Sequence, residues 1–414
     1  MHLPRCAAWL ALACLSSSSV IACSSKGDSQ GRADDDIVDV PQSPVKNQSI
    51  SNCWLYATMG WAESLHTSTG EAPLDWSESY LTYWHWFDQV YFDGAPDDKI
   101  DETGFFKQGM DLIWRFGIMS EGAFIPEETT SNRSARQSSA KSNMDASLRN
   151  GALSTPEARR DARLVRKELN LAWGLDEDVI ETMNAVFGEG YDRSLNQSFE
   201  MPAGTRIRRA TEIPVMLVNG TDPTPRRATL ADAIGDRAFE LGWGTRRGPY
   251  AWNEIDYPST PSEQRAMQQR IQRALHARQP LVISWFIDFA ALGSNGELRA
   301  PPQTPGRQGG HVTVLEDYEI ENVPGFGTLK AGIEETRPEA LEAALAPEAN
   351  IVFFRTKNSW GSMAGPVPAF NGYLDLYTKY LHGPVQKCDR PQGATETTCV
   401  NHQPFWRVAL PAGF

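Results

Sequence analysis

The chain has 414 residues, of which 41% are hydrophobic, so it can bury the core of one two-lobed domain or of two modest domains. Its formal net charge of −13 argues against a broad nucleic-acid interface, because such surfaces are normally basic. It contains no stretch of about 20 apolar residues that would cross a bilayer as a helix.

The first 40 residues are predicted to be a targeting segment and a tether. A short apolar stretch follows Arg5 and ends at Val20-Ile21-Ala22-Cys23. This ending is similar to a bacterial lipoprotein box, which implies a signal peptide over 1–22 and lipidation of Cys23. The alternative is an ordinary secretory signal cut after Ala22. Both place the protein outside the cytoplasm: anchored to a membrane of the bacterial cell envelope, or secreted.

Residues 23–40 are expected to form a disordered acidic tether, because they are too polar to pack. The folded domain is then expected over 41–414. A polar loop over 44–52 runs into an apolar helix that begins at Cys53. Free N–H groups and the helix dipole at such a position favour a thiolate. Gln48, five residues earlier, offers a side-chain amide for an oxyanion.

The alternative for Cys53 is a buried structural cysteine, since free cysteines are among the most buried residues. Apolar spacing predicts helices over 54–65, 76–90 and 104–116. Residues 133–174 predict one or two long helices with a solvated charged face, and 202–227 an irregular excursion or a hairpin.

A capping box predicts the next helix start. Thr260, Pro261 and Glu263 stand at its expected N-cap, first and third positions, and the helix should run to about residue 278. A buried strand is expected over 281–289, and further strands should carry His311, Phe353 and Tyr373.

Two segments late in the chain carry the partners that a nucleophilic cysteine needs. His311 follows two glycines and opens an alternating apolar strand, and Asn358 lies between a β-rich run and a Trp-Gly turn. A thiolate requires a base, and the base requires a third group that orients its ring.

These segments resemble the papain-like cysteine peptidases, in the order Cys53, His311, Asn358. Val45-Lys46-Asn47-Gln48 and Lys357-Asn358-Ser359-Trp360-Gly361 carry the resemblance, and the blocks 53–57 and 74–84 look like the bleomycin-hydrolase branch. The resemblance implies an α+β papain-like fold with a helical lobe mainly over 53–280 and an antiparallel β-sheet lobe mainly over 281–414. The active-site cleft would lie between the two lobes.

The resemblance also assigns roles. Cys53 would be the nucleophile, His311 the general acid and base, and Asn358 the orienter of His311, with Trp360 shielding their hydrogen bond. The substrate would be a peptide or protein, and no metal or organic cofactor is implied.

The chain departs from the family pattern in two places. Gln48 lies five residues before the cysteine, where papain relatives have six. In addition, 46 residues separate His311 from Asn358, and the excess over about 319–350 is expected to be a surface insertion, either a cleft lid or decoration.

Cys388 and Cys399 remain after the signal, the lipid site and the nucleophile are assigned. In an oxidising compartment they are expected to form a disulfide, since the further Cys or His ligands of a metal site are missing. Three functions stay open: a cysteine peptidase, a catalytically silent peptide-binding lipoprotein, and an acyl or amide transferase. Oligomeric state does not follow from the sequence.

Overall fold

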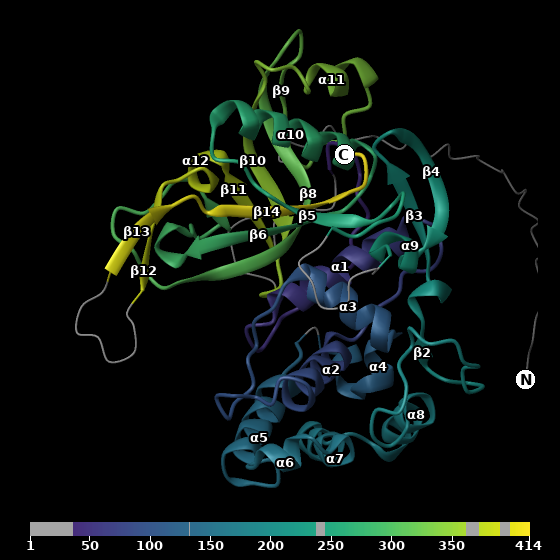
Figure 1. Ribbon diagram of the computed structural model, residues 1–414. Coiled ribbons are helices and arrows are strands. Elements are labelled where there is room, and N and C mark those ends of the chain that lie inside the picture. Colours follow the sequence, from purple (N-terminus) through teal and green to yellow (C-terminus); the bar gives the residue numbers. More distant parts are fainter. Residues whose placement is uncertain (1–35, 132, 237–244, 362–371, 390–397) are drawn as a thin grey trace, which may run out of the picture. The chain divides into compact units, whose positions relative to one another are not determined.

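The computed structural model describes residues 36–131, 133–236, 245–361, 372–389 and 398–414 (Figure 1). Helices dominate the first half of this part of the chain, and strands dominate the second. The α+β class predicted from the sequence is confirmed, with a helical lobe and a lobe built on a largely antiparallel sheet.

The helical lobe is organised around α1 (Cys53–Thr67), which is buried on all sides from Cys53 to His66. A helix that is apolar around its whole circumference belongs in a core. It packs against α2 (Glu78–Tyr91), α3 (Phe106–Phe116) and the sheet. These three helices confirm the predicted ranges to within a few residues.

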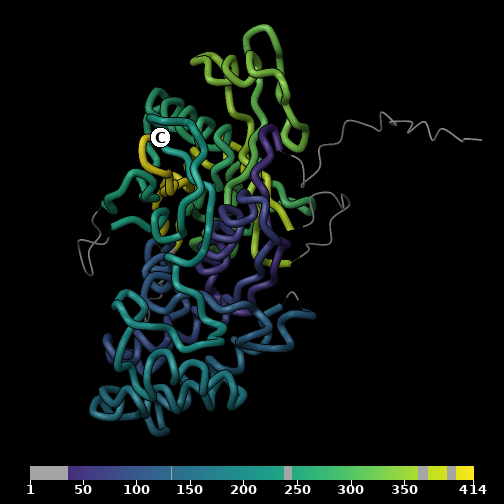
Figure 2. Tube along the Cα trace, turned by 90° about the vertical axis from the view of Figure 1, so that its right-hand side faces the viewer, coloured from purple at the N-terminus to yellow at the C-terminus, as the bar shows by residue number. Residues whose placement is uncertain are grey.

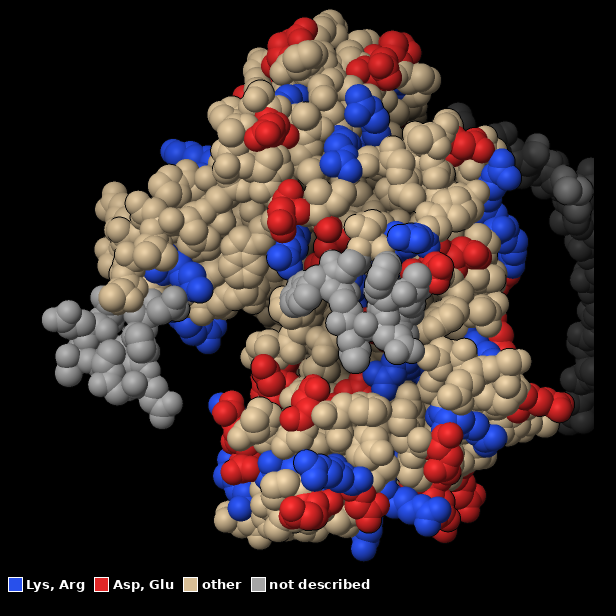
Figure 3. Space-filling model, viewed as in Figure 1, with Lys and Arg blue, Asp and Glu red and all other residues tan. Residues whose placement is uncertain are grey.

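For most of the other elements of this lobe, the sequence predicted no exact bounds. They are α4 (Glu121–Phe124), a 3-10 turn (Pro126–Thr129), α5 (Arg136–Asn150), α6 (Pro156–Arg159), α7 (Ala162–Trp173), α8 (Glu177–Phe187) and α9 (Leu230–Ile234), with the paired strands β1 (Ile118–Met119) and β2 (Ile207–Arg208), a 3-10 turn (Ala210–Glu212), and the hairpin β3 (Pro214–Asn219)–β4 (Asp222–Thr229). On the face shown in Figure 3, acidic and basic side chains crowd the helical lobe, as the alternating charges predicted.

One sheet of eight strands forms the second lobe, in the order β5-β14-β6-β8-β10-β11-β7 with β9 attached to β8. Its strands are β5 (Trp252–Asp256), β6 (Leu281–Asp288), β7 (Glu297–Leu298), β8 (Gln308–Val323), β9 (Gly327–Leu329), β10 (Asn350–Lys357), β11 (Tyr373–Tyr377) and β14 (Phe405–Pro411). All pairs are antiparallel except β11–β7, which is parallel.

The two faces of the sheet enter different cores, because side chains alternate along a strand. Val312 and Val314 of β8 pack into the core around α1. Leu315 of the same strand packs into a second core with α10 (Pro261–His276). The smaller elements of this lobe are a 3-10 turn (Phe289–Ala291), α11 (Pro338–Ala343), α12 (Thr378–Leu381) and the hairpin β12 (Val385–Asp389)–β13 (Thr398–His402).

The expected lobe boundary at residue 280 is too late. β5 pairs with β14, and the apolar side of α10 packs in the core of the sheet lobe, so both belong to the second lobe. The expected tether is too long at its C-terminal end. Ile37 and Val40 are buried, and the Ile37 N–H donates to Asp317 Oδ1 on β8 over 3.0 Å. Burial of these two apolar side chains stabilises the packing of this short segment on the sheet lobe, although a polar residue stands beside each of them.

The insertion over 319–350 lengthens β8, forms β9 and α11, and returns along α10. Arg265 and Gln272 of α10 donate to the backbone carbonyl of Ala344. Figures 1 and 2 show β9 and α11 at the end of the sheet lobe opposite α5–α8. This placement favours decoration over a cleft lid. In the described part of the chain, no helix has the length and apolarity needed to span a membrane.

Candidate active site

Cys53 is the first residue of α1, and its sulfur is surrounded by backbone N–H groups. The N-cap residue Asn52 makes no side-chain cap, because its amide donates to Thr82 and Gln137 in the interior. The N–H groups of Cys53 and Trp54 are therefore free to reach the Cys53 sulfur. The backbone N–H of Val312 on β8, next to His311, also favours charge on this sulfur by lowering the Cys53 pKa, and α1 and β8 are in contact.

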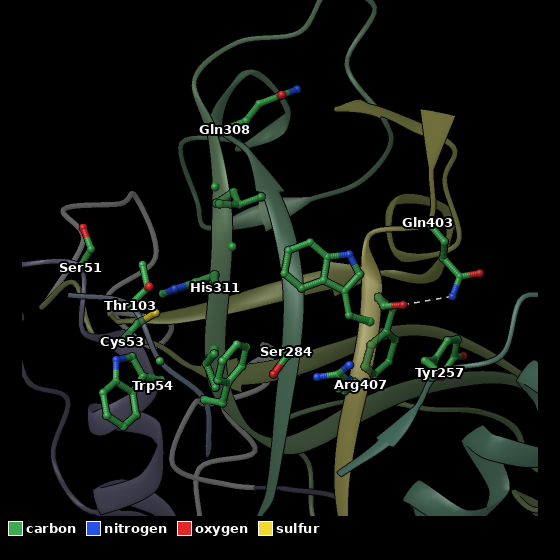
Figure 4. A pocket seen from close by; sticks show the side chains of 18 of the residues that line it. Ser51, Cys53, Trp54, Thr103, Tyr257, Ser284, Gln308, His311, Gln403 and Arg407 are labelled. Atoms are coloured by element: carbon green, nitrogen blue, oxygen red, sulfur yellow. Dashed lines mark hydrogen bonds between the residues drawn. The ribbon is translucent and has the colours of Figure 1, made fainter. Parts of the chain in front are cut away.

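His311 lies on β8 with its ring held on several sides. Its Nε2 donates to Asn358 Oδ1 over 2.8 Å, which leaves Nδ1 as the unprotonated nitrogen. The ring stacks on Trp360 with centroids 4.5 Å apart and an interplanar angle of 17°. Figure 4 shows His311 pointing from its strand toward Cys53.

Both residues line one cavity of about 950 Å³ between the lobes. Its walls come from the loop before α1, the 103–105 segment, β6, the start of β8 and β14. The lining includes seven large aromatic side chains: Trp54, Phe105, Tyr257, Phe289, Trp360, Phe405 and Trp406. The chain's last residue, Phe414, is not part of this lining; its carbonyl accepts a bond from Arg270 of α10.

Burial favours the neutral form of both candidate catalytic groups. It raises the pKa of the Cys53 thiol to about 11, although the three backbone N–H groups act in the opposite direction. It lowers the pKa of His311 to about 4, partly offset by the bond to Asn358. A thiolate at the helix start was expected from the sequence, whereas burial of the two side chains favours a neutral thiol beside a neutral imidazole.

Gln48 lines the same cavity and is fixed by two bonds. Its Oε1 accepts from the Ser359 hydroxyl over 2.5 Å, and its Nε2 donates to the Ile50 carbonyl over 2.7 Å. One N–H of the amide remains for another acceptor. The loop that is one residue shorter than in papain relatives therefore still brings this amide to the cavity.

A buried ionic network lies behind the site and was not recognised in the sequence. Lys46 Nζ contacts Glu78 at 3.0 Å and Asp75 at 2.7 Å, and Lys357 Nζ donates to Ser43 over 2.6 Å. Lys46 precedes Gln48 by two residues and Lys357 precedes Asn358, so the network ties both motifs to the helices. The available signal was a lysine inside each of the two motifs, Lys46 and Lys357, because a buried lysine needs an anionic partner.

The remaining site residues lie elsewhere. Cys388 and Cys399 face each other across β12–β13 and form a disulfide with an S–S distance of 2.07 Å. Cys23 lies outside the described residues. Among the residues that are described, no group of three or more His, Cys, Asp or Glu side chains could hold a metal ion.

Comparison with known proteins gives similarity at the level of solved structures. No protein-family model matches the sequence, and no curated protein matches it. Xylellain, a cysteine protease from Xylella fastidiosa, is 12% identical with a TM-score of 0.36, covering 90% of this chain and 84% of its own. PepW from Lactobacillus rhamnosis is 11% identical with a TM-score of 0.44, covering 91% and 81%.

Similarity at this level does not identify the residues that act. The function is therefore inferred from the geometry of the site.

Proposed function

We propose that this protein is a cysteine-type peptidase, with Cys53 as nucleophile, His311 as general acid and base, and Asn358 as the residue that orients His311. One observation carries the proposal. Cys53 and His311 line the same cavity, where the backbone N–H of Val312, beside His311, favours charge on the Cys53 sulfur, while Asn358 holds Nε2 and leaves Nδ1 as the proton acceptor.

The proposed reaction begins with transfer of the Cys53 proton to Nδ1 of His311 as the sulfur attacks a peptide carbonyl. The Cys53 N–H and the remaining N–H of Gln48 would stabilise the oxyanion. His311 then returns the proton to the leaving amine, and the C–N bond breaks. Water, deprotonated by His311, hydrolyses the thioester and regenerates the thiol.

The pKa directions bear on the timing of the first proton transfer. Because burial favours a neutral pair in the free protein, thiolate would form together with attack or after substrate has changed the cavity. Alkylation of Cys53 by neutral iodoacetamide should then rise with pH toward the Cys53 pKa of about 11. A preformed ion pair would instead give a rate that is already constant at neutral pH.

The decisive experiment is labelling of the folded domain by an epoxide-type cysteine-peptidase inhibitor. We expect one adduct, at Cys53, absent in Cys53→Ala and slowed about 100-fold or more in His311→Ala, the range for loss of a general base. His276→Ala is the matched control. His276 is another largely buried histidine whose pKa burial lowers to about 4, but it bonds to Tyr318 outside the cavity. No adduct in well-folded wild type would refute the peptidase.

The second candidate is a catalytically silent peptide-binding protein. The neutral state that burial imposes on both Cys53 and His311 is the observation in its favour. It predicts that peptides bind in the cavity without turnover and that Cys53→Ala leaves peptide affinity unchanged. Calorimetric titration of wild type and Cys53→Ala with an unlabelled peptide digest measures these affinities. Together with the labelling result, it separates the two functions.

We further propose that the protein is exported and anchored by lipid on Cys23, with residues 1–22 removed. The support is the Val20-Ile21-Ala22-Cys23 sequence. Metabolic labelling with an alkyne fatty acid should tag wild type but not Cys23→Ala. Equal labelling of both forms would contradict the anchor and favour the simple secretory signal.

A further inference from the structure

Arg307 is the outermost member of a stack that begins at His311. His311 stacks on Trp360 at 4.5 Å, and Trp360 stacks on Phe289 at 5.4 Å. The guanidinium of Arg307 in turn lies over Phe289, 4.1 Å from the centroid of its ring. All four side chains line the cavity. The column therefore holds a cation at a fixed place relative to the proposed acid and base.

The backbone of Arg307 is fixed as well. Its carbonyl accepts the Phe289 N–H over 2.9 Å. Both of its neighbours bond to the buried carboxylate of Asp288: the Gly306 N–H over 3.0 Å and the Gln308 amide over 2.7 Å. Gln308 also bonds to Gln386 and Cys388 of β12, so the disulfide hairpin supports this loop from outside. An arginine held this way loses less entropy when it binds a ligand.

The charges of the cavity wall do not balance. Its charged side chains are Asp256, Arg307 and Arg407, and Arg407 is paired with Asp256 at 2.8 Å. Asp288 has N–H donors on both oxygens and does not line the cavity. Within the described ranges, Arg307 has no carboxylate partner, although the whole chain carries a net charge of −13. An exposed, pre-positioned cation in such a protein is suited to an anion that arrives with the substrate.

We infer that Arg307 is a specificity-determining residue that binds a carboxylate of the peptide substrate. This inference rests on the proposed peptidase function. The carboxylate has two possible sources, an Asp or Glu side chain at a fixed distance from the scissile bond, or the C-terminal carboxylate of the peptide. The planar fork of arginine matches a carboxylate in two parallel hydrogen bonds, which gives position as well as charge.

The test uses a proteome-derived peptide library whose cleavage products are read by mass spectrometry. Wild type should prefer Asp or Glu at one position, or cleave at one fixed distance from the C-terminus. For peptides that carry the carboxylate, Arg307→Gln should lower kcat/KM about tenfold, the lower end for a charge-assisted bond. Amidation of the C-terminus then separates the two sources, because it abolishes the preference only if the terminal carboxylate is bound.

Arg299→Gln is the matched control. Its guanidinium also lies over a ring, that of Tyr377 at 4.7 Å, but it pairs with Glu297 and does not line the cavity. This variant should keep the wild-type preference. A cleavage pattern with neither an acidic preference nor a fixed distance from the C-terminus, or an unchanged pattern in Arg307→Gln, would overturn the inference.

Epoxide labelling of Cys53 keeps this outcome distinct from failure of the proposed function. If wild type labels at Cys53 but shows neither cleavage preference, the peptidase proposal stands and only this inference fails. If wild type fails to label, the peptidase proposal fails and this inference fails with it.

Discussion

The ring of His311 lies between two indoles from different parts of the chain. Trp360 stacks on one side, and Trp285, directly opposite His311 in the β6–β8 register, meets the ring at 5.4 Å and 64°. The Trp285 N–H donates to Thr313 Oγ1 over 3.1 Å, and both side chains are buried. Thr313 therefore holds the Trp285 indole in place, and this indole in turn holds the His311 ring. We regard Thr313 and Trp285 as positioning residues.

Thr313→Val tests this arrangement, because valine keeps the shape and removes the acceptor. A buried indole N–H without a partner costs about 1–3 kcal/mol, which the indole can relieve by turning away from His311. We expect kcat to fall several-fold with KM nearly unchanged, and the pH profile of Cys53 labelling to shift. Both are measured on the purified domain.

Thr356→Val is the control for that prediction. Thr356 is equally buried, lies on the adjacent strand β10, and its hydroxyl has no hydrogen-bond partner among the described residues. Its replacement should leave kcat and the pH profile unchanged. If both variants behave alike, the effect is general packing and Thr313 has no positioning role.

At the scale of elements, local signals identified some structures and missed others. The apolar spacing of α1, α2 and α3 is contained in each helix, so the sequence was sufficient. The capping box before α10 is wrong in detail. Thr260 is the N-cap, but its hydroxyl donates to the Glu263 carboxylate and makes no side-chain cap to the backbone. Residues 133–174 form three helices, with Gly151 ending α5 and Pro156 beginning α6.

Long-range pairing explains the elements that were missed. β5 pairs with β14, about 150 residues later, and no local pattern within 252–256 predicts that pairing. The site shows the same division. Motifs located Cys53, Gln48, His311 and Asn358, which the fold brings to one region. The roles argued for Trp285 and Arg307 depend on neighbours across strands and loops, and no local pattern encodes them.

For the molecule as a whole, the entry of residues 36–40 into the sheet lobe adds a buried carboxyl group to its core. Asp36 is 4% exposed and accepts the Val40 N–H over 2.9 Å. Burial, and then repulsion from Asp317, raise the pKa of Asp36 to about 9, against the opposing pull of Arg355. Asp39 also repels a negative charge on Asp36, and burial raises the pKa of the neighbouring Glu316 as well. Asp36 is therefore protonated at neutral pH in the folded protein.

This protonation makes stability depend on pH. The unfolded chain releases the Asp36 proton near its ordinary pKa of 3.8, whereas the folded protein holds it to about pH 9. The unfolded state binds fewer protons between these values, so stability falls as pH rises, by about 1.4 kcal/mol per pH unit for each such group. Burial raises the pKa of Glu121 to about 9 as well, which adds to the same slope.

Asp36→Asn should therefore flatten the decline of Tm between pH 6 and pH 8.5 without abolishing it. Asparagine keeps an oxygen for the Val40 N–H and carries no charge to bury, so at pH 8.5 the variant should melt higher relative to wild type than it does at pH 6. Scanning calorimetry across this range measures both slopes. Asp178→Asn, which removes an exposed carboxylate paired with Arg206, should leave the slope as in wild type. Equal slopes for wild type and Asp36→Asn would mean that residues 36–40 do not carry a buried proton into the sheet lobe.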